Sequence, residues 1–249
     1  MFPIRDHNPS ERTPYVTYTL IAVNILAFLF FYLPYLSNNA ALNEVYMTGG
    51  LVPARITSGQ GYFTFITSMF LHGGFMHLAG NMLFLWIFGD NLEDELGHVG
   101  FSVFYVASGV GAALLQIIAA PNSAVPMVGA SGAIAGVMGG YLLLFPKARV
   151  DVLFIIVIIF KVFPLPAWLM LGAWFALQVF NGAASPSGEG GVAHWAHAGG
   201  FIVGFLWVLP KWFALGGPRF WARTHGHPPH PDAQYRFQSS SIPTVKRRR

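Results

Sequence analysis

The chain has 249 residues, of which 54% are hydrophobic and only 10% are charged, whereas charged residues make up about 25% of an ordinary soluble domain. Its long apolar runs approach the roughly 20 residues that cross a bilayer, and none alternates like a barrel strand, which predicts an all-α, polytopic membrane protein. The chain lacks cysteine, which excludes disulfides and thiolate chemistry. Its net charge of +4 does not indicate nucleic-acid binding, because the cations form no patch interleaved with aromatic residues.

The first half of the chain contains three predicted spans. A short polar lead, residues 1–14, precedes an apolar segment over residues 15–33, which lacks a small-residue cleavage site and is expected to be retained as the first span. The second span is expected over residues 65–88 and contains His72, His77 and Asn81, which are unusual in lipid. An acidic stretch, residues 90–95, is expected to be a solvated turn before the third span at residues 101–120.

Three further spans are expected in the second half. The fourth begins at Ser131 and ends at Phe145, and the fifth and sixth cover residues 167–180 and 192–209. Between the fourth and fifth, Asp151 and Lys161 interrupt an apolar stretch and leave about nine uninterrupted apolar residues, too few to span. We therefore expect residues 152–160 to be a re-entrant or interfacial piece.

The cations predict the orientation of the chain. They lie mostly in the lead, after the fourth span and in residues 210–249, whereas the connections after the first, third and fifth spans carry only Arg55. Since Lys and Arg favour the cytoplasmic side, six spans with both termini in the cytoplasm fit this pattern. The basic tail, residues 210–249, is expected to be disordered. Its histidines lack the further ligands of a metal site, so we expect neither a metal nor a cofactor; they are His225, His227 and His230.

Three polar residues from three spans share one expected depth. By helix rise, Ser131, His197 and His77 stand roughly 21, 18 and 17 Å from the cytoplasmic ends of their spans. An imidazole beside a serine can remove its proton, which makes Ser131 a candidate nucleophile and His197 a candidate base. No carboxylate lies at this depth, so we expect a dyad whose imidazole is oriented by packing or by a backbone hydrogen bond. His194, one turn before His197, is the rival base.

Other residues complete this candidate site. His77 and Asn81 share one helical face and could donate to an oxyanion, as could the amide of Ser131 at a helix start; Gly129 is included in this candidate oxyanion site. Small residues repeated every four positions predict close packing of the fourth and sixth spans: Gly132, Gly136, Gly140, Gly200 and Gly204. Any one of these polar residues could instead have a structural role, so the joint pattern carries the catalytic hypothesis.

The motifs resemble those of the rhomboid family of intramembrane serine proteases. Gly129-Ala130-Ser131-Gly132 is similar to the family's GxSG, His77 with Asn81 to its HxxxN, and Ala196-His197-Ala198-Gly199-Gly200 to its AHxGG. The resemblance covers about residues 15–209, and the first six residues also resemble the lead of many bacterial members.

The resemblance implies a six-span, rhomboid-like bundle over residues 15–209, in a bacterial inner membrane. It implies an endopeptidase that cleaves transmembrane segments of other membrane proteins through an acyl-enzyme. Ser131 would be its nucleophile and His197 its base; His77, Asn81 and the Ser131 amide would stabilise the oxyanion. His72 would have a structural role near the first loop.

The chain departs from the family pattern in two places. Ala135 stands where many members have an aromatic residue that stacks on the histidine, so we expect another group, such as Trp195, to restrain the imidazole. A Trp-Arg pair of the first loop is also absent. Two alternatives remain open: an inactive relative that binds membrane clients, and a transporter that uses the histidines as a proton relay. The oligomeric state is not predicted.

Overall fold

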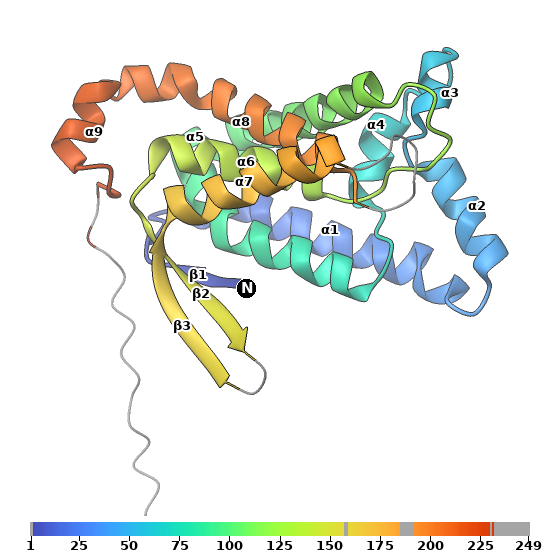
Figure 1. The fold of residues 1–249 in the computed structure, drawn as a ribbon, viewed down its shortest axis with the longest axis horizontal. Helices are drawn as coiled ribbons and strands as arrows, with labels where there is room; N and C mark the ends of the chain where they lie inside the picture. Colours follow the sequence, from blue (N-terminus) through green and yellow to red (C-terminus); the bar gives the residue numbers. More distant parts are fainter. Residues whose placement is uncertain (1, 157–158, 185–191, 230, 232–249) are drawn as a thin grey trace, which may run out of the picture.

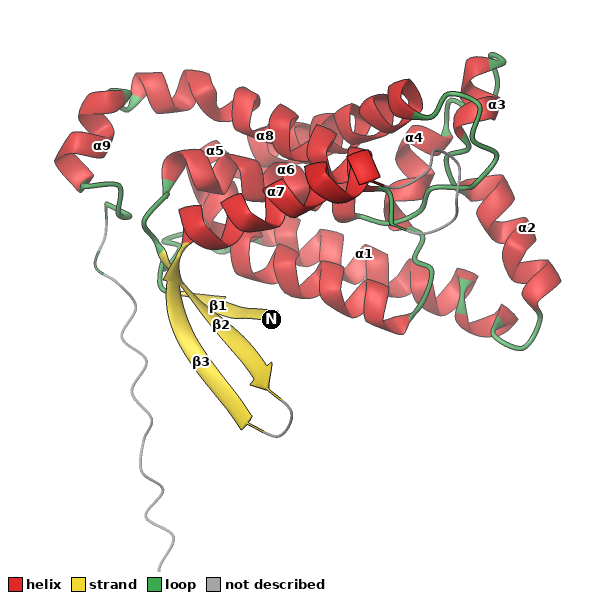
Figure 2. Cartoon of the chain, in the orientation of Figure 1, coloured by secondary structure: helices red, strands yellow, loops and turns green. Residues whose placement is uncertain are grey.

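The computed structural model describes residues 2–156, 159–184, 192–229 and 231. Helices lie side by side in a bundle, and a small sheet projects from one end (Figures 1 and 2). The helices are α1 (Tyr15–Phe31), η1 (Leu33–Tyr35), α2 (Asn39–Gly49), α3 (Pro53–Thr57), α4 (Thr64–Thr67), η2 (Ser68–Phe70), α5 (Phe75–Ala119), α6 (Ser131–Leu144), α7 (Ala167–Ala184), α8 (His194–Ala214) and α9 (Pro218–Thr224), and the strands are β1 (Phe2–Asp6), β2 (Arg149–Ile156) and β3 (Ile159–Pro166).

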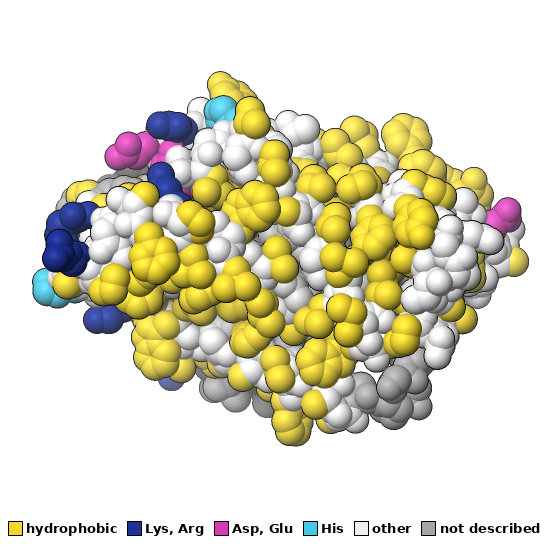
Figure 3. All heavy atoms as spheres, turned by 90° about the horizontal axis from the view of Figure 1, so that it is seen from above, with side chains coloured by type: hydrophobic (Ala, Val, Ile, Leu, Met, Phe, Trp, Pro, Cys, Tyr) yellow, Lys and Arg dark blue, Asp and Glu magenta, His cyan; other side chains and the backbone are white. Residues whose placement is uncertain are grey.

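The surface is apolar over the middle of the bundle. Among the described residues, 3 helical segments are long and apolar enough to cross a membrane, namely Tyr15–Tyr35, α5 and α7, or up to 4 if α8 and α9, bent by 76°, form one span. The apolar helix α6 is shorter, with 14 residues. Figure 3 shows one face covered largely by hydrophobic side chains, with most of its visible charged side chains gathered at the end that carries α9.

The helix α5 contains the second predicted span only from Phe75 onward, and it continues through nearly all of the third; the residues expected to begin the second span form instead the short helices α4 and η2 and a connecting segment. The 45 residues of α5 would extend about 68 Å if straight, roughly twice the hydrocarbon core. The helix breaks at Gly97, whose φ of 71° and ψ of 163° are not helical and whose positive φ is open to glycine. A Cβ added to Gly129 would meet His77, and one added to Gly132 would meet Ala112, so residues before and after the break reach the same level. The two halves of α5 therefore run back along each other.

The acidic stretch at residues 90–95 is not the solvated turn that we predicted. It is helical within α5, and Glu93 is only 1% exposed. The carboxylate of Glu93 accepts hydrogen bonds from the backbone amides of Val16 and Thr17, each at 2.8 Å, and from the Thr17 hydroxyl at 2.7 Å. Because Pro14, the N-cap of α1, makes no side-chain cap, Glu93 supplies the acceptors that the first turn of α1 needs.

The structure is mostly helical, as the sequence predicts, but a three-stranded sheet departs from a purely all-α fold. β2 pairs antiparallel with both β1 and β3, in the order β1-β2-β3. The lead is thus partly a strand, and the described part of residues 152–160 belongs to a β-hairpin. The hairpin is rich in β-branched and aromatic residues, which suit a pleated surface, and its strands satisfy one another's backbone groups.

The sheet also gives ion-pair partners to Asp151, one of the two charged residues that interrupt the apolar run. Asp151 accepts from Arg5 Nε at 2.6 Å and lies 3.0 Å from His7 Nε2. Burial opposes ionisation of Asp151, but these hydrogen bonds outweigh it and hold the pKa of the carboxyl below its ordinary value. The lead and the hairpin are therefore joined by charge as well as by strand pairing.

The sixth predicted span is longer than expected, and the tail is partly ordered. α8 continues through Pro210 to Ala214, and α9 follows it. The indole of Trp221 donates to the carbonyl of Leu143 at 3.0 Å, which ties α9 to the end of α6. Our prediction of disorder from residue 210 is thus wrong for this segment, whereas residues 232–249 and His230 lie outside the described residues. No group of three potential metal ligands occurs within the described part of the chain.

The helices α6 and α8 touch through their backbones. A Cβ added to Gly200 would collide with the carbonyl oxygen of Gly132, and one added to Gly204 would collide with the backbone of Gly136. On another side of α6, a Cβ at Gly136 would collide with the Ser108 side chain of α5. Such contacts allow helices to approach closely in a membrane, where no hydrophobic force brings them together.

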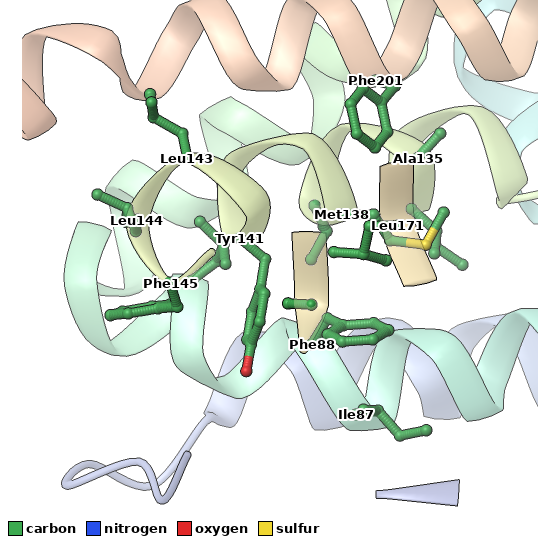
Figure 4. Packing of buried hydrophobic residues seen from close by; sticks show 14 of the residues in the cluster. Ile87, Phe88, Ala135, Met138, Tyr141, Leu143, Leu144, Phe145, Leu171 and Phe201 are labelled. Atoms are coloured by element: carbon green, nitrogen blue, oxygen red, sulfur yellow. The ribbon is translucent and has the colours of Figure 1, made fainter. Parts of the chain in front are cut away.

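A buried tyrosine fixes the other end of α6. The ring of Tyr141 packs between Phe88, with centroids 4.9 Å apart, and Phe145, at 5.4 Å (Figure 4). Its hydroxyl donates to Asp6 Oδ2 at 2.7 Å. Burial raises the pKa of Asp6 to about 8, so β1 presents a mostly protonated carboxyl to α6 at neutral pH.

Replacing Gly204 by alanine should lower the stability of the protein in detergent. The added methyl group overlaps the Gly136 backbone and forces α6 and α8 apart, and overpacking of this kind costs about 1–3 kcal/mol. Thermal unfolding should show a melting temperature lower by several degrees. Gly172→Ala on α7 is the matched control, because an added Cβ there has nothing within 4 Å. Equal melting temperatures for Gly204→Ala and the wild type would contradict the backbone contact.

The buried carboxyl of Asp6 should make stability depend on pH. The native carboxyl keeps its proton up to about pH 8, whereas an unfolded aspartic acid loses it at about pH 4. Between these values the native state binds more protons, so this group's contribution to stability falls as pH rises. Asp6→Asn keeps an acceptor but cannot titrate, so its melting temperature should fall less than that of the wild type between pH 5 and pH 8.5. Parallel melting curves for the two proteins would show that Asp6 does not titrate as proposed.

Candidate active site

Ser131 lies at the first position of α6, after a sharp turn of the chain. Gly129 has a φ of 129°, and its amide donates to the carbonyl of Ser68 at 2.9 Å. That amide is therefore already bonded, and our inclusion of Gly129 among the oxyanion donors is not supported. Gly129 instead leaves space, because a Cβ there would lie 2.8 Å from both Cε1 and Nε2 of His77. Among the described residues nothing accepts from the amide of Ser131.

The side chains of Ser131 and His197 are in contact. Ser131 Oγ lies 2.8 Å from His197 Nε2, although the two residues stand 66 positions apart in the chain. One comes from the start of α6 and the other from the first turn of α8, which the glycine contacts hold together. Both side chains are half-buried. This contact is the one that the depth argument required.

The imidazole of His197 is oriented by a side chain that we did not predict. His197 Nδ1 lies 2.9 Å from Oε1 of Gln178, a residue of α7 that is 8% exposed. Because an amide oxygen only accepts, Nδ1 carries the proton, and the lone pair of Nε2 faces the Ser131 hydroxyl. A side-chain amide thus takes the place of the backbone hydrogen bond that we named, with packing, as a means of orienting the imidazole. A polar residue in an otherwise apolar predicted span was the available signal, as it was for Asn81.

A tryptophan of α7 packs against the same imidazole. The Trp174 ring lies 5.7 Å from that of His197, at an interplanar angle of 33°. Trp195, which we expected in this role, packs instead against Gly182. Trp174 precedes Gln178 by four residues, so the two lie on one face of α7. That spacing was visible in the sequence but does not by itself indicate a partner.

The rival histidine has a different position. His194 Nδ1 lies 2.9 Å from the same Gln178 oxygen, and its ring meets that of His197 edge-on, with centroids 6.4 Å apart. Within the described residues the Ser131 hydroxyl contacts His197 and not His194. The geometry therefore favours His197 as the partner of Ser131.

Two further nitrogen donors face the turn at Gly129. His77 Nδ1 accepts from the Gly73 amide at 3.3 Å, so the proton of its neutral ring is on Nε2, the atom beside Gly129. Asn81 Nδ2 is buried, has no partner among the described residues, and would lie 3.6 Å from a Cβ at Gly129. A buried donor without a partner is costly unless a ligand or a water supplies an acceptor. Both N–H groups are thus available next to Ser131.

His72 lies behind His77 and outside this group of donors. It is 1% exposed, its Nδ1 bonds the Phe70 carbonyl at 3.3 Å, and its ring meets the His77 ring edge-on at 5.1 Å. Its own carbonyl accepts from the Tyr46 hydroxyl at 3.0 Å, which links it to α2 in the first loop. His72 therefore packs against His77 and supports the position of its ring.

The donors, the serine and the imidazole line one cavity of about 540 Å³. Its walls are otherwise mostly apolar and include side chains of α5, α7 and the loop before α6: Met76, Phe84, Met127 and Trp174. A nucleophile, a base and oriented N–H donors in one apolar cavity are the parts that acyl transfer needs. The described residues around it include no carboxylate and no cation.

Comparison with known proteins agrees with these motifs. Residues 59–212 match the family model of the rhomboid domain. The chain is 32% identical over 208 residues to "Rhomboid protein 1, mitochondrial" of Saccharomyces cerevisiae, which covers 79% of this chain and 54% of that protein. It is 32% identical over 170 residues to "Rhomboid-like protein 11, chloroplastic" of Arabidopsis thaliana, covering 60% and 53%. It is 33% identical over 129 residues to "Rhomboid protease GluP" of Bacillus subtilis, covering 52% and 24%.

The chain thus spans about half the length of the first two relatives and about a quarter of the third. The rhomboid domain model nevertheless matches more than half of this chain, and the motif residues fall within the matched range. Its long apolar helices are those of an integral membrane protein. The chain belongs to the rhomboid family.

Proposed function

We propose that this protein is an intramembrane serine endopeptidase that cleaves transmembrane segments of other membrane proteins. The observation that carries the proposal is the 2.8 Å contact between Ser131 Oγ and His197 Nε2, inside a largely apolar cavity. Membership of a family that includes "Rhomboid protease GluP" supports it.

In the proposed reaction, Ser131 forms and then loses an ester bond. Its oxygen attacks the scissile carbonyl while His197 Nε2 takes the hydroxyl proton, giving a tetrahedral intermediate. His197 then returns this proton to the leaving amine as the C–N bond breaks. A water molecule, deprotonated by the same imidazole, hydrolyses the acyl-enzyme and regenerates the Ser131 hydroxyl. Gln178 holds His197 in the tautomer, protonated at Nδ1, that this series of reaction steps requires.

The negative oxygen of the intermediate would be stabilised by three N–H groups. They are His77 Nε2, Asn81 Nδ2 and the amide of Ser131, none of which has an acceptor within the described residues. The N-terminus of α6 adds a dipole of favourable sign. Gly129 contributes by admitting the substrate backbone, since any side chain there would strike His77.

The proposed substrates follow from the environment of the site. A transmembrane helix bonds its own amides, so a segment with helix-destabilising residues, and a small residue at the cut, must unwind before Ser131 can attack it. Six spans with both termini in the cytoplasm, as the cations predict, place the Ser131 end of α6 toward the outer surface, where water can enter. The lead favours a bacterial inner membrane as the location.

Ser131→Ala should abolish cleavage of a transmembrane substrate in detergent while the melting temperature stays close to that of the wild type. The variant lacks the nucleophile but removes only one half-buried oxygen. Labelling by a fluorophosphonate, followed by mass spectrometry, should locate the adduct on Ser131. An inactive client-binding relative or a histidine-relay transporter would show no adduct. Full cleavage by Ser131→Ala would refute the proposal.

The two histidines of α8 provide a matched comparison for the same experiment. His197→Ala should lower kcat/KM by orders of magnitude, because only His197 contacts the Ser131 hydroxyl. His194→Ala removes a neighbour that also bonds Gln178, so a much smaller loss is expected. The reverse order of the two losses would assign the base to His194.

A further inference from the structure

We propose that Gln178 is a positioning residue for His197, and that a neutral amide takes the place that a carboxylate holds in a Ser-His-Asp triad. This inference rests on the proposed protease function. Its geometric basis is one oxygen, Gln178 Oε1, lying 2.9 Å from Nδ1 of His197 and 2.9 Å from Nδ1 of His194.

The two hydrogen bonds leave Gln178 little freedom. An amide oxygen has two lone pairs, and two imidazole N–H groups, three residues apart at the start of α8, occupy both. The side chain is 8% exposed, and its helix, α7, also places Trp174 against His197. The imidazole is therefore held at its Nδ1 edge by an acceptor and at its face by an aromatic ring.

Only one orientation of the amide permits catalysis. With Oε1 toward the histidines, His197 is protonated at Nδ1 and presents a lone pair to Ser131. With the NH₂ group there instead, His197 Nδ1 would be the acceptor and Nε2 would carry the proton of the neutral ring. An imidazole N–H facing the Ser131 hydroxyl could not take its proton. The orientation seen in the structure is the one that a general base requires.

Among the described residues that line the cavity with His197 there is no carboxylate, Lys or Arg. The titratable groups near it are His194 on its own helix and His77 on α5, while α6 contributes Ser131. The sequences of α6 and α7 contain no Asp, Glu, Lys or Arg. A carboxylate inside a bilayer is costly. An amide can fix the tautomer without that cost, but it does not balance the charge of the imidazolium.

The test uses Gln178→Met and Gln178→Glu in the full chain, with Leu177→Met as the control on the lipid-exposed side of α7. Methionine keeps the volume but cannot accept as an amide does. Loss of one net hydrogen bond at the base should lower kcat about tenfold, with little change in KM. Leu177→Met should match the wild type. Melting temperatures measured in parallel show whether each variant is folded.

Gln178→Glu tests whether the side chain at this position faces Nδ1 of His197. A carboxylate stabilises the imidazolium, so the acidic limb of the kcat/KM profile should move to higher pH by about one unit or more. Activity should remain measurable on the alkaline side, because glutamate restores the acceptor. If Gln178 only fills space, methionine is harmless; if the side chain at this position does not face Nδ1 of His197, the profile of Gln178→Glu keeps the wild-type limb.

The outcomes separate this proposal from the proposed function. A wild-type protein that neither cleaves a transmembrane substrate nor forms a fluorophosphonate adduct overturns both. An active wild type with full kcat in Gln178→Met and no pH shift in Gln178→Glu overturns the role of Gln178 alone. If Gln178→Met does not fold, the pH profile of Gln178→Glu decides.

Discussion

The contact between the backbones of α6 and α8 is the constraint on which the rest of the structure depends. In a bilayer, apolar side chains gain little by leaving lipid, so two helices touch closely only where small residues permit it. Here Gly200 and Gly204 bring α8 against Gly132 and Gly136 of α6. Ser131 directly precedes Gly132 on α6, and His197 lies three residues before Gly200 on α8. The 2.8 Å separation of their side chains is therefore set by glycines that take no part in the chemistry.

The short helix α6 is held at both ends by segments far from it in sequence. At the Ser131 end, the Gly129 amide bonds the Ser68 carbonyl and so fixes the turn that precedes the helix. At the other end, Tyr141 bonds Asp6 of β1, and the Leu143 carbonyl accepts from Trp221 of α9. The first strand and the last described helix thus bond the end of α6 that is remote from Ser131. A segment with no catalytic residue can in this way determine where Ser131 stands.

The sequence predicted which residues meet at the candidate site better than it predicted the segments and side chains that hold them in place. The hydroxyl, the imidazole and the His77–Asn81 pair were found because polar groups at one depth in apolar spans are few. The strands β2 and β3 were missed because a short apolar run next to charges fits a strand as well as an interfacial piece. The burial of Glu93 was missed because its partners, Val16 and Thr17, lie more than 70 positions away. Gln178 and Trp174 were missed because one amide and one of two indoles in an apolar span do not reveal which helix they face.

The candidate site suits the proposed protease reaction, although the described residues that line its cavity include no carboxylate and no Lys or Arg. In the described structure the groups around Ser131 are a hydroxyl, imidazoles, amides and a helix N-terminus, while the carboxylates cluster at other levels, as in the Glu93 cap of α1. In the proposed reaction, proton transfer from Ser131 to His197 creates an imidazolium and an oxyanion only a few ångströms apart. In a medium of low dielectric constant two opposite charges at that distance attract strongly, and the N–H donors and the α6 dipole stabilise the negative partner. A fixed carboxylate behind His197 would stabilise the imidazolium further, but it would carry its desolvation cost throughout the resting state. A neutral acceptor such as Gln178 avoids that cost and leaves the charges to appear only when they can stabilise each other.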